Sequence, residues 1–163
     1  MKTNAARLLD TLGIPYEART YVVDPDDLSA GNVAGKIGLP LEQVFKTLLC
    51  RLQEGEYVFA VVPGDAELDL KKLAVAAGSR KAELASLKDV EPLTGYVRGG
   101  VTVMGAKKSF AAFADESIEL FDRISVSAGM RGLQLLLAPA DYLKASQATV
   151  ADLTRVPITS VPL

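Results

Sequence analysis

Alternating apolar and polar positions predict a chain in which helices and strands follow one another irregularly. Helical spacing of alanine and leucine predicts a first helix that begins at Thr3 or Asn4 and ends at Gly13. Further helices are expected at 28–37, 70–77 and 139–144. Strands are expected at 16–23, 44–50, 57–62, 123–126 and 133–137, where apolar and β-branched residues gather. A short turn at 54–55 predicts an antiparallel hairpin between two of these strands.

This order of elements predicts an α+β fold rather than a doubly wound sheet, because several strands are joined by short hairpins. The 163 residues suit a single domain, which we expect to span 1–163. Apolar residues make up 49% of the chain and charged residues 23%, a composition typical of soluble globular proteins. The tail at 157–162 is expected to be loosely attached.

The sequence also indicates the cellular compartment in which the protein resides. No apolar stretch approaches the length of a membrane span, and residues 1–7 lack the apolar core of a signal peptide. The lone Cys50 cannot form an internal disulfide, which agrees with a reducing compartment. We therefore expect a cytoplasmic protein with no membrane partner.

A single lysine interrupts the apolar run at 44–50. In a strand, alternate side chains share a face, so Lys46 points the same way as Val44 and Leu48. An ammonium group among apolar side chains is costly unless it is paired, so Lys46 is a candidate for a functional cleft. The alternative is a lysine at a sheet edge, whose stem covers apolar surface while its amine stays in water. The strand alone does not decide between these two interpretations.

The chain contains no histidine, which removes Ser-His-Asp and Cys-His machinery and most zinc sites. Any chemistry must come from lysine, hydroxyl groups, carboxylates, backbone N–H groups or the substrate. Cys50 lies in an apolar strand with no histidine to lower its pKa, which favours a core residue over a nucleophile. The net charge of −2 provides no global basic field, and DNA is not expected as a partner.

Two glycine-rich loops, 95–100 and 127–132, organise the second half of the chain. Glycine permits positive φ and a close approach of the backbone to a ligand, and successive N–H groups in such loops can hold an anion. Tight turns and bulges are the alternative explanation for either loop alone. Basic residues at 71–72, 80–81, 98, 107–108 and 131 could add a local phosphate-binding patch, although most exposed lysine pairs are simply solvated.

Four motifs, taken in order, resemble the YbaK family of aminoacyl-tRNA deacylases. They are Val44-Phe45-Lys46-Thr47-Leu48, Leu68-Asp69-Leu70-Lys71-Lys72, Gly95-Tyr96-x-x-Gly99-Gly100 and Val126-Ser127-x-Gly129-x-Arg131-Gly132. Within that family the chain is most similar to the stand-alone deacylases of Cys-tRNA(Pro). The resemblance implies a mixed, partly barrel-like β-sheet flanked by helices, with neither a metal ion nor an organic cofactor.

The resemblance also implies a set of site residues. Those expected to act in catalysis are Lys46, Thr47, Gly100 and Ser127, and those expected to bind substrate are Tyr21, Phe45, Gly99, Gly129, Arg131 and Gln134. The chain departs from the family pattern at two positions. Val103 stands where many relatives have proline, and Gln134 stands where an acidic residue is common, although glutamine can still accept a hydrogen bond.

The implied activity is removal of cysteine wrongly attached to proline tRNA, with the thiol of the substrate cysteine attacking its own ester. Backbone N–H groups and the Lys46 ammonium are suitable stabilisers of the oxyanion that develops. The expected partners are aminoacyl-tRNA, as substrate, and prolyl-tRNA synthetase. Two alternatives stay open: a deacylase for another small amino acid such as alanine, and a non-catalytic module that binds a nucleotide or the CCA end.

Overall fold

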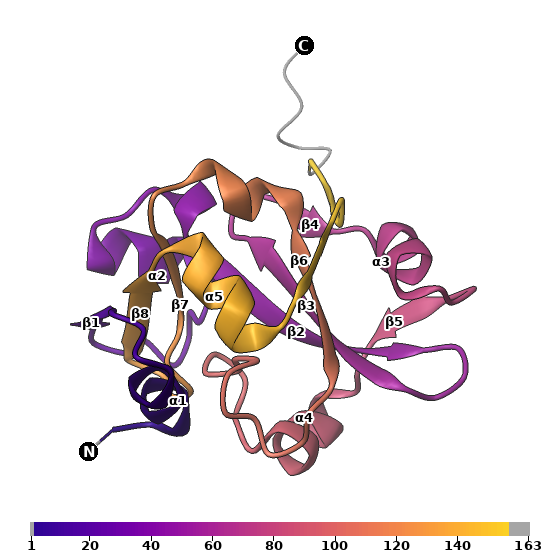
Figure 1. Ribbon diagram of the computed structural model, residues 1–163, viewed down its shortest axis with the longest axis horizontal. Coiled ribbons are helices and arrows are strands. Elements are labelled where there is room, and N and C mark those ends of the chain that lie inside the picture. Colours follow the sequence, from indigo (N-terminus) through magenta and orange to yellow (C-terminus); the bar gives the residue numbers. More distant parts are fainter. Residues whose placement is uncertain (1, 157–163) are drawn as a thin grey trace.

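The computed structural model describes residues 2–156, and a five-stranded mixed sheet lies at its centre (Figure 1). The strand order is β5 (Ala82–Leu84), β2 (Phe45–Leu52), β3 (Tyr57–Pro63), β6 (Ala111–Asp115) and β9 (Thr149–Ala151). β2 runs antiparallel to β3 and β5, whereas β3, β6 and β9 are parallel to one another. The hairpin predicted at 54–55 is confirmed. The tail that we expected to be loosely attached lies outside the described residues.

A second, antiparallel sheet has three strands in the order β1 (Glu17–Thr20), β8 (Leu133–Leu137) and β7 (Ile124–Ser127). One parallel bridge, between Val44 and Ser125, ties β7 to the start of β2. β4 (Glu67–Leu68) and β10 (Thr154–Arg155) form a separate ribbon. Within residues 2–156 the sheets meet without closing into a barrel. The predicted α+β class with a mixed sheet is confirmed.

The helices pack around these sheets (Figure 1). They are α1 (Asn4–Leu12), α2 (Ala30–Ile37), α3 (Leu70–Ala77), α4 (Leu87–Thr94) and α5 (Pro139–Ser146), with short 3-10 turns at Leu41–Gln43 and Glu116–Leu120. The Thr3 hydroxyl caps α1 by accepting from the Ala6 N–H, and the Asp69 carboxylate caps α3. Gly13 and Gly78 end the same two helices in the left-handed conformation, as the sequence predicted.

The two faces of the β2–β3 hairpin belong to different parts of the core. Cys50 and Ala60 pack with Leu73 of α3 on one face. Phe45 and Val61 pack with Tyr142 of α5 on the other. β2 is therefore covered on both faces, and side chains that alternate along it serve two different surroundings.

Several elements differ from the sequence prediction. The strand expected at 16–23 ends at Thr20: the Tyr21 N–H still bonds to the Gly132 carbonyl, but Gly132 has φ of +89°, so the partner chain leaves the extended conformation there. The helix expected at 28–37 starts at Ala30, where the Ser29 hydroxyl caps it. α4 and β6 were not predicted. α4 carries Pro92 in its interior, and proline disfavours helix, whereas β6 is rich in alanine, which has little strand preference.

Candidate active site

A cavity of about 690 Å³ lies along the outer edge of β2, on the side away from β3. It opens there because β2 is only partly paired on that side: β5 reaches Cys50–Leu52 and β7 reaches only Val44. The intervening residues of β2 form one wall. The other walls come from the segment 26–31 at the start of α2, from 84–90, from the loop 98–101, and from Ser127 and Gln134.

Lys46 enters this cavity from the middle of β2. Its side chain is half-buried, and its ammonium group makes no ion pair with any described residue. Lys46 leaves β2 on the same face as Cys50, as the alternation predicted. A cation without a partner in a half-enclosed cavity is available to a ligand that carries or develops negative charge.

Thr47 presents its backbone to the same cavity. The Leu49 carbonyl accepts a 2.9 Å hydrogen bond from the Ala85 N–H at the outer edge of β2. In an antiparallel strand the backbone groups of every second residue point the same way, so the N–H and C=O of Thr47 also point outward. Neither β5 nor β7 reaches Thr47. One backbone donor and one acceptor therefore face the cavity beside Lys46.

The Thr47 side chain points to the opposite face, toward the buried Tyr142 of α5. Burial raises the pKa of Tyr142, and the nearby hydroxyls of Thr47 and Ser146 oppose that rise. Neither hydroxyl meets hydrogen-bond geometry, so the Tyr142 hydroxyl has no partner among the described residues. Thr47 therefore lies between the cavity, which its backbone faces, and the neutral phenol of Tyr142, which its side chain faces.

The two glycine-rich loops lock together beside the cavity. A side chain at Gly100 would place its Cβ 3.0 Å from the Met130 Cα, so only glycine lets the loops approach this closely. The Arg131 Nε–H donates to the Arg98 carbonyl at 2.7 Å and fastens the same contact. The Gly100 N–H donates to the Val97 carbonyl, so it is not free for a substrate oxyanion. Gly100 shapes the loop and does not line the cavity.

Ser127 and Gln134 lie side by side on β7 and β8 at the inner end of the cavity, paired across the two strands. Both are buried, with 9% and 5% of their surface exposed. The Ser127 hydroxyl accepts from the Gly129 N–H, which leaves its own proton free to donate. The Gln134 Oε1 accepts from the Ser125 hydroxyl at 2.8 Å, which directs the amide nitrogen away from that contact. The inner end is therefore polar but uncharged.

Of the residues expected at the site, the cavity wall contains Phe45, Lys46, Thr47, Gly99, Ser127 and Gln134. Tyr21, Gly100, Gly129 and Arg131 stand behind the wall, in the loops that support it. The sequence did not indicate the walls at 26–31 and 84–90. The first was interpreted only as a turn and helix start, and the second runs from β5 into α4, neither of which was predicted.

Charge is unevenly distributed around the opening. Asp26 and Asp27 line one side, and hydrogen bonds from the Ser29 hydroxyl and backbone N–H lower the pKa of Asp27. Arg98 lines another side, where its guanidinium makes no ion pair with a described residue. No group of three or more His, Cys, Asp or Glu side chains between residues 2 and 156 is placed to hold a metal ion.

Cys50 lies outside the cavity and is completely buried. Burial raises the pKa of its thiol to about 12, so the thiolate that a nucleophile requires is scarce at neutral pH. The only cysteine of the chain is therefore a core residue, and the site contains no protein thiol or imidazole.

Comparison with known proteins identifies the family. Residues 24–145 match the aminoacyl-tRNA editing domain. This chain belongs to that family. A protein of Enterococcus faecalis, EbsC, named as a candidate Cys-tRNA(Pro)/Cys-tRNA(Cys) deacylase, is 42% identical over 153 residues, which cover 94% of this chain and 93% of EbsC. The YbaK-type family predicted from the motifs is confirmed, and with it the enzyme class, an aminoacyl-tRNA deacylase.

Two further comparisons support the family and the fold. ProXp-y of Escherichia coli K12, a multifunctional Ser/Thr-tRNA deacylase, is 33% identical over 122 residues, covering 72% of this chain and 73% of its own. A solved structure described as a candidate trans-editing enzyme for prolyl-tRNA synthetase superposes with a TM-score of 0.79 at 24% identity, covering 95% of this chain and 99% of its own. At that identity the structure supports the fold alone. Between residues 2 and 156, every helix is too short or too polar to span a bilayer.

The packed loops give a stability prediction. Gly129 has φ of +98°, and an added Cβ would lie 2.7 Å from the Tyr96 ring. We expect Gly129→Ala to lower the free energy of unfolding by about 1–3 kcal/mol, because it adds both backbone strain and a clash. Gly35→Ala is the matched control: this α2 glycine has open space around it, so alanine should be neutral or stabilise by up to about 1 kcal/mol. Urea unfolding measures both, and equal effects would contradict the packing described here.

Proposed function

We propose that this enzyme removes cysteine from mischarged proline tRNA by cleaving the aminoacyl ester. The observation that carries the proposal is the cavity beside β2, where an unpaired Lys46 ammonium and the backbone N–H of Thr47, which has no ladder partner in β5 or β7, face the same space. The name of the E. faecalis relative, which is 42% identical over nearly its whole length, supports cysteinyl-tRNA as the substrate.

The cavity suits the end of an aminoacyl-tRNA. Its volume of about 690 Å³ lies within the range of about 300–1,000 Å³ typical of small-molecule sites. That space accommodates a terminal adenosine that carries a small amino acid. The buried, uncharged inner end formed by Ser127 and Gln134 favours a small side chain with hydrogen-bonding ability over a large apolar one.

In the proposed mechanism the substrate supplies the nucleophile. The cysteine sulfur attacks its own ester carbonyl, a carbon–sulfur bond forms, and the ester carbon–oxygen bond breaks. The proton of the thiol passes to the ribose oxygen, which leaves with the tRNA, and water then opens the resulting thiolactone to free cysteine. Tethering of the thiol beside the ester replaces the base that the chain lacks. The burial of Cys50 and the absence of histidine support this route.

The protein's part is to stabilise charge and to orient the ester. Negative charge develops on the carbonyl oxygen during attack, and preorganised donors in a site sheltered from water stabilise it most effectively. In the proposal, the Lys46 ammonium and the Thr47 N–H are those donors. Ser127 and Gln134 hold the amino acid, while Phe45 and Gly99 limit the space around it.

A second substrate class has support of its own. The E. coli relative, 33% identical, is named for serine and threonine rather than cysteine. A hydroxyl substrate would suit the donors of Ser127 and Gln134, but it would need water as the attacking group. Membership of an editing family favours either deacylase over a non-catalytic binding module.

Prolyl-tRNA synthetase is the proposed protein partner. The chain has a net charge of −2, so its own hold on tRNA is expected to be weak. Mischarged proline tRNA is a product of the synthetase, and an enzyme that acts on that product gains selectivity by working beside its source.

The first prediction of the proposed function concerns Lys46. We expect Lys46→Ala to keep the fold and to lower deacylation of Cys-tRNA(Pro) by about 2–4 kcal/mol of transition-state stabilisation, roughly 30- to 900-fold in rate. Lys71→Ala is the matched control, because Lys71 is exposed on α3, away from the cavity. Single-turnover ester loss, with circular dichroism as the check on folding, measures the effect. Wild-type turnover by a folded Lys46→Ala protein would remove Lys46 from the site.

The second prediction concerns the nucleophile. Cys50→Ala should leave the rate on Cys-tRNA(Pro) within about twofold, because the thiol is buried and protonated. The wild-type enzyme should hydrolyse Ser-tRNA(Pro) far more slowly, because an alcohol ionises much less readily than a thiol. Paired rate measurements on the two esters provide the test. Equal rates would instead indicate activated water and would end the substrate-thiol mechanism.

A further inference from the structure

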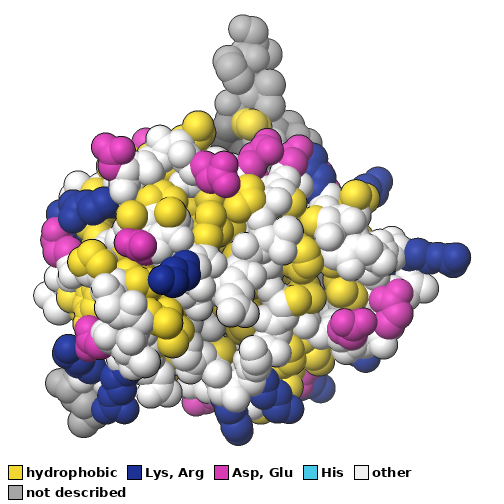
Figure 2. Space-filling view, in the orientation of Figure 1, with side chains coloured by type: hydrophobic (Ala, Val, Ile, Leu, Met, Phe, Trp, Pro, Cys, Tyr) yellow, Lys and Arg dark blue, Asp and Glu magenta, His cyan; other side chains and the backbone are white. Residues whose placement is uncertain are grey.

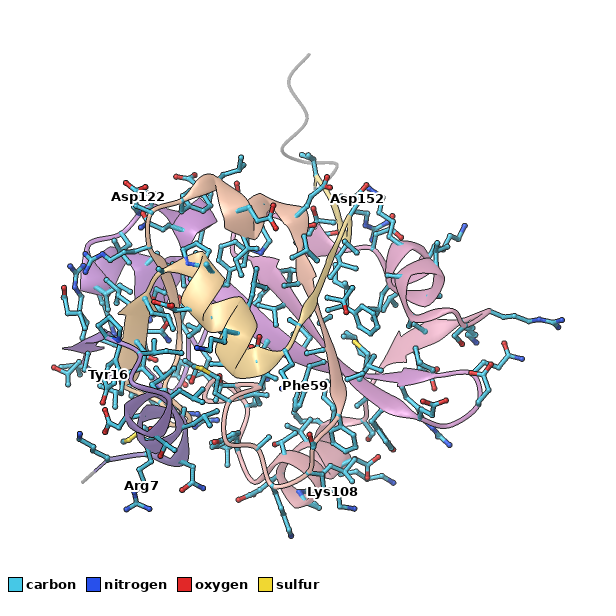
Figure 3. The ribbon with its side chains drawn as sticks, in the orientation of Figure 1. Arg7, Tyr16, Phe59, Lys108, Asp122 and Asp152 are labelled. Carbon is cyan, nitrogen blue, oxygen red and sulfur yellow. The ribbon has the colours of Figure 1, made fainter. Side chains whose placement is uncertain are left out.

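Basic side chains gather along one margin of the molecule, next to the cavity. In Figure 3 the labelled Arg7 and Lys108 both project from the lower margin, below α1 and α4, and dark blue side chains mark the same margin in Figure 2. We define the basic edge as Arg7, Lys88, Arg98, Lys107 and Lys108. Its members come from α1, from α4 and from the loop that follows α4.

Backbone contacts fix these segments together. The Lys107 N–H donates to the carbonyl of Thr94, the last residue of α4, at 2.8 Å. Gly105, two residues earlier, is so close to the start of α1 that an added Cβ would lie 2.8 Å from the Asn4 carbonyl carbon. The loop therefore bridges α4 and α1, and its lysines stand between the two helices.

The basic edge continues into the cavity. Arg98 lines the cavity directly, and Lys88 follows Leu87, another residue of the cavity wall. Asp26 and Asp27, both exposed, also line the opening, and the pKa of Asp27 is lowered. A polyanion that leaves the cavity is therefore repelled by these two carboxylates and attracted toward the basic edge.

Structural roles do not explain these cations. The ion pairs of the described residues use Lys2, Arg19, Lys72, Arg123 and Arg155, and none involves the basic edge. Lys107 gains from the negative end of α4, but Lys88 lies in the first turn of that helix, where a cation is unfavourable. Asp89 and Glu91 on α4 reduce the net positive charge of the basic edge, but they form no ion pair with its lysines.

We propose that the basic edge binds the phosphodiester backbone of the CCA end and acceptor stem of the tRNA. Arg98 contacts the phosphate nearest the terminal adenosine, and Lys88, Lys107 and Lys108 follow the phosphates that lead away from the cavity. Arg7 extends the same path to α1. This inference rests on the proposed function, because that function places the terminal adenosine in the cavity. Contacts of this kind are independent of base sequence and sensitive to salt.

The test reverses two charges of the basic edge. Lys107→Glu/Lys108→Glu should lower kcat/KM for Cys-tRNA(Pro) about tenfold or more, through KM, and should reduce the slope of log affinity against log salt by about one for each lost phosphate contact. Hydrolysis of 2′(3′)-O-cysteinyladenosine, which has no phosphate, should be unchanged. Arg51→Glu/Lys144→Glu is the matched control, because it makes the same charge change at two exposed positions outside the cavity wall, on β2 and α5, and should alter neither substrate by more than about twofold.

Three results would overturn the inference: full activity of the reversed variant on tRNA, an equal loss on both substrates, or an equal loss in the control. Binding of uncharged proline tRNA, measured by fluorescence anisotropy across a salt series, separates the inference from the proposed function. If the wild-type enzyme hydrolysed no cysteinyl ester but lost tRNA affinity on reversal of Lys107 and Lys108, the function would fail and the basic edge would stand.

Discussion

The gap in backbone pairing along the outer edge of β2 is the constraint on which the rest of the site depends. β5 covers the end of β2 at Cys50–Leu52, β7 touches its start at Val44, and neither reaches Thr47. Buried backbone groups are almost always paired, so an open stretch of strand inside a fold implies a ligand or water in that place. The cavity also explains how Lys46 can sit in an apolar strand, because its side chain lines the cavity instead of packing into the core.

Close contacts between the two glycine-rich loops shape the cavity wall beside this gap. Gly100 packs against Met130, and the Arg131 guanidinium donates a hydrogen bond to the Arg98 carbonyl. Two loops that are distant in sequence therefore form one wall. The proposed chemistry follows from the functional groups that are absent from this wall and from β2. The wall and β2 offer a cation, backbone donors and hydroxyl groups but no thiolate or imidazole, which suits an ester whose own side chain attacks. In the proposed mechanism a small preorganised set of donors is sufficient for catalysis.

The sequence predicted the local features well, because local features have local causes. Caps at Thr3 and Asp69, the hairpin after β2 and the orientation of Lys46 all follow from residue type and spacing. It could not predict the cavity, because the gap depends on where β5 and β7 pair with β2, which is a matter of long-range packing. It missed α4 because Pro92 argues against a helix, and with α4 it missed the cavity wall at 84–90. It predicted that Gly100 acts in catalysis; in the structure the Gly100 N–H closes a turn onto Val97.

In the proposed function, the cavity beside β2 recognises cysteine esterified to tRNA. The most direct measurement incubates the purified enzyme with Cys-tRNA(Pro), Ala-tRNA(Pro) and correctly charged Pro-tRNA(Pro), and follows loss of each ester with time. We expect rapid loss of cysteine, much slower loss of alanine, which has no thiol, and an intact prolyl ester. Loss of the prolyl ester at a rate comparable to that of the cysteinyl ester, or no loss of the cysteinyl ester above the spontaneous rate, would contradict it.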